Sequence, residues 1–167
     1  MYIRSEQPAD QQAVHEINTA SFETQDEANL VDALRTHASP IVSLVAEMNS
    51  ELVGHILFSP VTLSGHRDVS MMGLAPMAVL PGNQRTGIGS ALGLAGIEAC
   101  RQIGAEGIVV LGHPAYYPKF GFVPSSRYGI VSEYDVPEDV FMVLEVEENV
   151  LDGKSGTISY HGVFGDI

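Results

Sequence analysis

The hydrophobic positions first recur with helical spacing in two segments near the start of the chain. Residues 8–19 place Ala13, Val14 and Ile17 on one face, and residues 26–37 carry a similar stripe of leucine and valine. Acidic residues open the second segment, where they interact favourably with a helix dipole. The pattern predicts two helices that are joined by a short polar loop.

The next apolar stretches are extended rather than helical. Residues 41–48 and 51–63 are rich in β-branched residues and are separated by a short polar turn, which is typical of an antiparallel hairpin. Residues 71–81 form a largely apolar run that suits a buried central strand. Pro76 lies within this run, and because proline cannot donate to a sheet ladder, it marks an edge, a bulge or a break in strand pairing.

A long amphipathic helix and a short strand follow. Residues 85–103 have the helical period, and Gly104 stands where helices commonly end. Residues 107–113 resemble a buried strand, so the three elements form a right-handed strand–helix–strand unit. The helix face expected to be buried consists of Ile88, Leu92, Ala95, Ala99 and Ile103.

The last third of the chain is less regular. Residues 113–122 contain two prolines and cannot hold a long helix. Residues 141–148 and 157–164 are expected to be the last two strands. The order of elements therefore predicts one domain over residues 1–167, of the α+β (mixed α/β) class, with a central sheet flanked by helices.

Composition and charge narrow the classes of function. The 167 residues include eight Lys and Arg against 21 Asp and Glu, a formal net charge of −13, which disfavours nucleic acid and anionic membrane surfaces as partners. No apolar run reaches the roughly 20 residues of a membrane span. Residues 1–12 lack the apolar core of a secretory signal, and a single cysteine, Cys100, excludes an internal disulfide framework. We therefore expect a cytoplasmic protein.

The segment PGNQRTGIGS, residues 81–90, carries the most specific chemistry. Gly87 and Gly89 allow a ligand to approach the backbone closely, and the unpaired N–H groups of a first helical turn attract anions. Arg85 is the only basic side chain nearby in the sequence. A Walker A loop is disfavoured because no lysine follows either glycine, and a Rossmann site because the next strand ends without an acid. A glycine-rich loop that only starts a helix stays open.

Two motifs in this part of the chain match one protein family. The residues QRTGIG, 84–89, match in full the Gln/Arg-x-x-Gly-x-Gly/Ala signature of the GNAT N-acetyltransferase superfamily, and they too lie between a strand and a helix. The segment YYPKFGF adds a tyrosine, Tyr117, four residues before a Gly-Phe pair. Over nearly its whole length the chain resembles this superfamily. The resemblance implies the GNAT acyl-CoA acyltransferase fold, whose mostly antiparallel sheet has splayed fourth and fifth strands.

The resemblance also implies acetyl-CoA as the acyl donor. Its pyrophosphate would lie on the glycine-rich loop, and its pantetheine arm would pair with a strand edge freed at Pro76. Met77 and Val79 would offer backbone groups to it, with Ala78 facing the other way, and one backbone N–H would polarise the thioester carbonyl. The residues expected to bind the cofactor are Met77, Ala78, Val79, Gln84, Arg85, Thr86, Gly87, Ile88, Gly89 and Ser90.

By the same resemblance, a neutral amine would attack the thioester directly while both substrates are bound. Tyr117 would then protonate the leaving thiolate, a group of pKa about 8.5. The other interpretation of Tyr117 is a packed aromatic whose hydroxyl finds a hydrogen-bond partner. Tyr116 aligns with an apolar position of the family and is expected in the core.

The chain departs from the family at the general base. Many members carry a glutamate on the fourth strand, but residues 71–81 contain no acid. His55, His113 and Glu23 are the remaining candidates, and none is favoured, because a lone histidine is more often structural. The missing acid keeps open a non-catalytic module of the same fold that binds acyl-CoA as a sensor or scaffold.

The acceptor is expected to be a primary amine of a small molecule or a protein. The acid-rich segment FETQDEAN, residues 22–29, suits a cationic acceptor and equally suits a solvated helix start. The other histidines show no ligand spacing, so no metal site is expected. Since members of the family often form dimers, a homodimer is also open.

Overall fold

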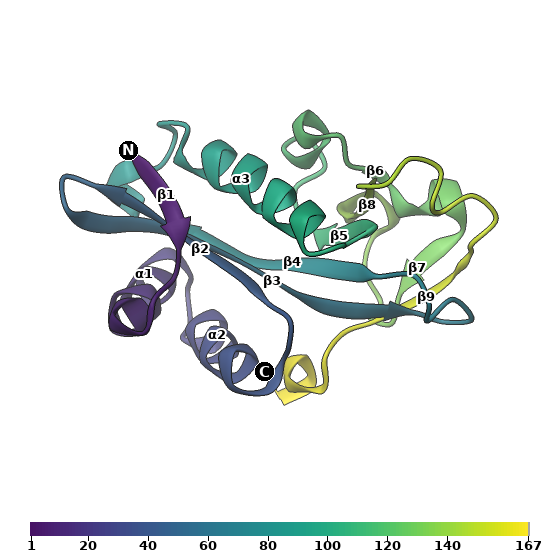
Figure 1. Cartoon of the computed structure of the whole chain (residues 1–167), viewed down its shortest axis with the longest axis horizontal. Coiled ribbons are helices and arrows are strands. Elements are labelled where there is room, and N and C mark those ends of the chain that lie inside the picture. Colours follow the sequence, from purple (N-terminus) through teal and green to yellow (C-terminus); the bar gives the residue numbers. More distant parts are fainter. Residues whose placement is uncertain (167) are drawn as a thin grey trace.

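The computed structural model describes residues 1–166, in which a twisted mixed sheet separates helices on its two faces (Figure 1). The strands are β1 (Tyr2–Ser5), β2 (Val42–Met48), β3 (Glu51–Leu63), β4 (Met71–Val79), β5 (Gly107–Leu111), β6 (Val123–Pro124), β7 (Ile130–Ser132), β8 (Phe141–Glu145) and β9 (Gly156–Ser159). The α-helices are α1 (Gln11–Ser21), α2 (Asp26–His37) and α3 (Ile88–Gln102). Short 3₁₀ helices occupy Pro8–Asp10, Pro81–Asn83, Tyr117–Phe120, Ser125–Tyr128, Glu138–Val140 and Gly162–Asp166.

The strand order confirms the predicted mixed sheet. Neighbours follow the order β1-β2-β3-β4-β5-β8-β6, and β9 joins β3 to β7. β4 and β5 are parallel, as a strand–helix–strand unit requires, and every other pair on the main path is antiparallel. Helix α3 covers one face, whereas α1 and α2 lie against the other (Figure 1).

Three short strands were not predicted from the sequence. β1, β6 and β7 have four, two and three residues, too few for their period to stand out. β1 exists because Tyr2–Ser5 pairs with the exposed edge of β2. The strand expected over 157–164 ends at Ser159, and a 3₁₀ turn takes its place from Gly162.

The buried face of α3 differs from the predicted one. Ile88 and Leu92 are buried as predicted, whereas Ile103, which follows the last residue of α3, is 48% exposed because Gly93 and Gly96 take the buried positions of the later turns. A Cβ at Gly96 would collide with the ring of Phe58, and one at Gly93 would lie 2.6 Å from the Phe120 ring. Apolar periodicity does not count glycine, so the pattern placed the stripe on the wrong side of the last turns.

Separate apolar clusters fill the two faces of the sheet. On the α3 face, Phe58 and Leu92 belong to the largest cluster, and on the other face Val14 and Leu34 anchor α1 and α2. A third cluster lies under β7 and β9. Within residues 1–166 no helix is both long and apolar enough to cross a membrane.

The pairing of β4 with β5 breaks off halfway along β4. Met71 to Leu74 pair with Gly107 to Val110, and beyond Leu74 the two strands separate. On its other side β4 has a bulge, because Ala75 and Pro76 together face the single residue Leu57 of β3. The splay and the position of Pro76 are those expected from the sequence, since proline offers no N–H to extend the ladder.

Candidate active site

The splay leaves one edge of β4 free of strand partners. The Leu80 N–H donates to the Val53 carbonyl of β3 (2.9 Å), so by alternation the backbone groups of Ala78 also point to β3. Those of Met77 and Val79 point the opposite way, into the gap between β4 and β5. The Val79 carbonyl accordingly accepts side-chain hydrogen bonds from Ser21 Oγ and Gln84 Nε2, both at 3.1 Å.

The glycine-rich loop turns directly from β4 into α3. Gly87 caps the helix with φ of 90°, a conformation that glycine adopts without strain. The Ala91 N–H bonds to the Gly87 carbonyl at 3.0 Å and opens the helical series, so the N–H groups of Ile88, Gly89 and Ser90 lack acceptors within the helix. Together with the helix dipole, these N–H groups form a site for an anion.

A cavity of about 460 Å³ connects this helix start with the free edge of β4. Seven of the expected cofactor-binding residues line it, namely Met77, Val79, Gln84, Arg85, Gly87, Gly89 and Ser90. The other three do not: Ala78 and Ile88 are buried in the core, and the Thr86 hydroxyl turns back to the Asn83 carbonyl at 2.5 Å.

Three further residues of this cavity were missed in the sequence, Asn83, Tyr116 and Lys119. Lys119 Nζ lies 2.7 Å from Ser90 Oγ and 3.8 Å from the centre of the Tyr116 ring. The Tyr116 hydroxyl lies 2.9 Å from where a Cβ on Gly89 would be, so Tyr116 covers the helix start rather than joining the core. Gly93 was the residue of the sequence that could have indicated this. Because Gly93 has no side chain, the Phe120 ring packs against α3 and the neighbouring Lys119 lies beside the start of the helix.

The electrostatics of this cavity are those of an anion site. Arg85 and Lys119 line it, and neither takes part in any ion pair of residues 1–166. Among the described residues no Asp or Glu lines it. In a chain of net charge −13, a cavity with two free cations and a helix N-terminus favours a phosphate-bearing ligand.

Tyr117 does not line the cavity, but its ring centre lies 5.1 Å from that of Tyr116, which does. The Tyr117 ring packs against Gly112, which follows β5, and makes an edge contact with Phe122 at 5.8 Å between ring centres. Its hydroxyl takes part in no side-chain hydrogen bond of residues 1–166. Burial, and secondarily Tyr116, raise the pKa of Tyr117 to about 12, so the phenol keeps its proton at neutral pH.

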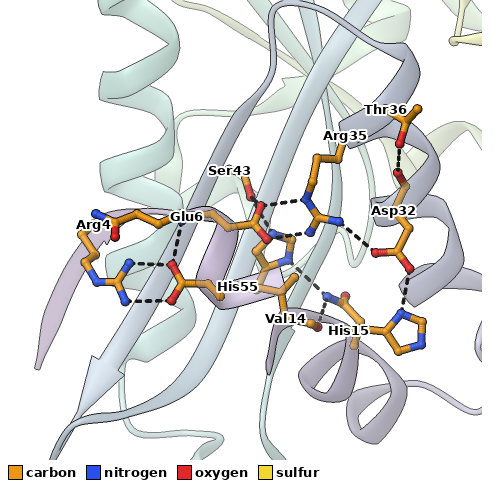
Figure 2. Close-up of polar contacts among 12 residues, drawn as sticks. Arg4, Glu6, Val14, His15, Asp32, Arg35, Thr36, Ser43 and His55 are labelled. Atoms are coloured by element: carbon orange, nitrogen blue, oxygen red, sulfur yellow. Dashed lines mark hydrogen bonds and ion pairs between the residues drawn. The ribbon is translucent and has the colours of Figure 1, made fainter. Parts of the chain in front are cut away.

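His55, one of the candidate bases, is sealed beneath α1 (Figure 2). Its Nδ1 lies 3.2 Å from Asn18 Nδ2, and its Nε2 lies 2.9 Å from Ser43 Oγ, which itself donates to Glu6 Oε1 at 2.8 Å. Burial, and then the charge of Arg35, lower the pKa of His55 to about 3. His55 is therefore a neutral structural residue without access to the cavity.

The structure brings neither of the other candidate bases to the cavity. His113 is exposed beyond β5, where its Nδ1 accepts a hydrogen bond from the Ala115 N–H at 3.1 Å. Glu23 is exposed in the loop between α1 and α2. Cys100 is fully buried and its pKa is raised to about 12, so it is no nucleophile.

Comparison with known proteins identifies relatives that cover most of the chain. The family model described as "Acetyltransferase (GNAT) family" matches residues 11–122. An N-acetyltransferase of Escherichia coli strain K12, YjhQ, is 39% identical over 135 residues, which cover 78% of this chain and 75% of YjhQ. A second one from the same strain, YhbS, is 32% identical over 165 residues and 98% of each chain.

Two solved structures share the fold and are complexes with CoA or acetyl-CoA. The crystal structure of Escherichia coli YhbS in complex with CoA has a TM-score of 0.92 and 30% identity, over 98% of this chain and 91% of that one. That of a GNAT family acetyltransferase from Brucella melitensis in complex with acetyl-CoA has a TM-score of 0.80 and 34% identity, over 98% and 97%.

Proposed function

Because the chain belongs to the GNAT acetyltransferase family, we propose that it transfers the acetyl group of acetyl-CoA to a primary amine. One observation of the structure carries this proposal. The cavity that joins the free edge of β4 to the start of α3 is lined by Arg85 and Lys119 and by no acid of the described residues. Two structural relatives, each at least 30% identical, hold CoA or acetyl-CoA.

The donor is proposed to lie along this cavity from end to end. Its pyrophosphate accepts hydrogen bonds from the free N–H groups of the first turn of α3, and Arg85 and Lys119 add charge. Its pantetheine arm pairs with Met77 and Val79 on the free edge of β4. A backbone N–H of this edge polarises the thioester carbonyl, where negative charge develops during attack. We leave Ala78 out, since its backbone groups point to β3.

The transfer is proposed to proceed by direct attack. The amine nitrogen bonds to the thioester carbon, the C–S bond breaks and the sulfur leaves as a thiolate, while the proton that the amine loses replaces the one that Tyr117 gives to the sulfur. The Tyr117 phenol, which keeps its proton because its pKa is raised, donates to the leaving sulfur. An acetyl-cysteine intermediate is disfavoured, because the thiol of Cys100 is buried. The amine arrives neutral, since His55 is sealed away.

Initial-rate kinetics test the proposal. Release of the CoA thiol is followed while acetyl-CoA and a primary amine are varied together, and mass spectrometry identifies the acetylated amine. Intersecting double-reciprocal lines support attack within a ternary complex, whereas parallel lines would indicate an acetyl-enzyme and overturn the direct mechanism.

A non-catalytic acyl-CoA sensor is the second candidate. The observation that favours it is the lack of a base, because β4 carries no acid and His55 is buried. A sensor binds acetyl-CoA and releases no thiol above the rate without protein for any amine tested. The same assay therefore separates the two candidates.

A further inference from the structure

A second cavity, of about 470 Å³, lies beside β7 and the segment that leads from it to β8. Its charged lining residues are Glu133, Asp135 and Glu138, and no lysine or arginine of the described chain lines it. Tyr134 contributes an aromatic side chain that is 38% exposed. Carboxylates beside an exposed aromatic ring suit a cationic ligand, since both groups attract positive charge.

A serine hydroxyl of the same cavity offers a ligand a hydrogen-bond partner that is independent of the acids. Ser125 is only 3% exposed, and it lines the cavity. Its hydroxyl takes part in no side-chain hydrogen bond of residues 1–166. The Ser125 hydroxyl is not one of the enclosed polar atoms that lack a partner, so it is open to the cavity and available to a ligand N–H group.

Strands β8 and β5 connect the second cavity with Tyr117, the proposed proton donor. Phe141 of its lining pairs with Leu111 at the end of β5, and the next N–H, that of Gly112, donates to the Val140 carbonyl at 2.9 Å. Gly112 is also in contact with Tyr117, because a Cβ on Gly112 would collide with the Tyr117 ring. Leu111 and Gly112 at the end of β5 therefore connect the lining of the second cavity with the proposed proton donor, Tyr117.

A pair of tyrosines connects the second cavity to β4 as well. The rings of Tyr134 and Tyr160 lie 5.6 Å apart, and a Cβ on Gly73 of β4 would be 3.3 Å from the Tyr160 ring. Gly73 belongs to the last stretch of β4 that pairs with β5 before the strands separate. Burial, and then the charge of Glu133, raise the pKa of Tyr134, as expected beside a carboxylate.

From these contacts we propose that the second cavity holds the acceptor, and that the acceptor is an amine with at least one further positive charge. This inference rests on the proposed acetyltransferase function. The reacting amine points to the open end between β4 and β5 in its neutral form. The second, protonated group lies among Glu133, Asp135 and Glu138 and donates to the Ser125 hydroxyl.

Three acceptors of equal chain length test the charge requirement. Hexylamine, 1,6-diaminohexane and 6-aminohexanoic acid share a primary amine and differ at the far end, which is neutral, positive or negative. We expect kcat/KM for the diamine to exceed that for hexylamine by about tenfold, which is more than two equivalent amines explain, and the amino acid to be poorest. Equal values for hexylamine and the diamine would overturn the inference.

Matched variants separate local binding from the overall charge. The variant E133Q/D135N/E138Q removes three acids from the cavity, and the discrimination between the diamine and hexylamine is expected to fall to about twofold. The control E51Q/E98Q/E148Q changes the net charge equally at exposed residues outside the lining and is expected to keep the discrimination. If the control loses it as well, the effect is long-range attraction and the inference fails.

A binding experiment keeps this inference distinct from the proposed function. NMR titration of the CoA-bound protein measures the affinity of the diamine and of hexylamine without turnover. Tighter binding of the diamine that disappears in E133Q/D135N/E138Q supports the cavity assignment even if no thiol is released, in which case only the transfer function fails. Equal binding of both ligands overturns the inference whatever the turnover.

Discussion

The cavities proposed for the donor and for the acceptor are nearly equal in volume and opposite in charge. The one at the start of α3 measures about 460 Å³ and is lined by Arg85 and Lys119 without an acid of the described residues. The one beside β7 measures about 470 Å³ and is lined by three acids without a lysine or arginine of that part of the chain. A net charge of −13 thus says little about either cavity, because the few cations are placed locally.

The two cavities also differ in which groups produce their electrostatic potential. At the start of α3 the backbone supplies much of the positive potential through free N–H groups, so two side chains suffice. Beside β7 the negative potential comes entirely from side chains on a segment rich in turns. The donor cavity is therefore sensitive to backbone shape, whereas the proposed acceptor cavity depends on the identity of its acids.

The largest effect is expected at Tyr117, whose ring packs against Gly112 at the end of β5. Tyr117→Phe removes the proton donor and keeps the packed ring, so kcat should fall by about a hundredfold or more. Affinity for acetyl-CoA, measured by calorimetry, should stay within about twofold, since Tyr117 does not line the donor cavity. Tyr2→Phe, at an exposed tyrosine of β1, is the control. An unchanged kcat would remove Tyr117 from the chemistry.

The pH dependence of stability tests the burial of His55, a residue that lines neither of these cavities. His55 is neutral in the folded state, with a pKa lowered from 6.5 to about 3, so below pH 6.5 the unfolded chain binds one proton more. As the pH falls toward 3, the free energy of unfolding should drop by about 1.4 kcal/mol per pH unit through His55.

Denaturant titration of wild type and His55→Asn at a series of pH values isolates this contribution. The two stability curves should converge as the solution is acidified. Parallel curves would mean that His55 is protonated in the folded protein and is not sealed as described.

The shape of the donor cavity is probed next, at Gly89. Gly89→Ala places a Cβ 2.9 Å from the Tyr116 hydroxyl and fills the space where a phosphate approaches the backbone. The Kd for acetyl-CoA should rise by about tenfold, equivalent to about 1.4 kcal/mol. Gly82→Ala, where a Cβ meets nothing within 4 Å, should bind as wild type. Equal affinity of both variants would argue against the helix start as the anion site.

The smallest of these effects concerns the charge of the donor cavity. Lys119→Met removes one cation and leaves the backbone N–H groups, so the Kd for acetyl-CoA should rise by about fivefold at low salt. The loss should shrink as ionic strength increases, because salt screens a partly exposed charge. Lys154→Met changes the only other lysine, which lies outside this cavity, and should leave affinity unchanged.

Much of the fold could be predicted from the sequence because its signals are local. The helix expected over 26–37 and the strand expected over 51–63 have those bounds in the structure. β1, β6 and β7 could not be found, because so short a strand is defined by its partner rather than by its own pattern. The bulge and the end of pairing at Pro76 follow from the chemistry of one residue.

The candidate site was predicted where it is continuous in sequence and missed where it is not. The loop 84–89 could be recognised because its glycines form part of a contiguous sequence motif. Lys119 reaches Ser90 across 29 positions, and the approach depends on Phe120 packing against Gly93. Tyr116 was assigned to the core because its neighbours are apolar. The three acids beside β7 had no motif to distinguish them from an ordinary solvated segment.

Thermal unfolding with and without acetyl-CoA tests the central claim, that the cavity at the start of α3 is the donor site. At a hundredfold excess over Kd the ligand should add about 2.7 kcal/mol, or roughly 5–10 °C in Tm. Free adenosine, which lacks the pyrophosphate and pantetheine, should add little, and Gly89→Ala should reduce the shift at equal acetyl-CoA. No shift of the wild type at millimolar acetyl-CoA would contradict the claim, because the loop would then serve only to start a helix.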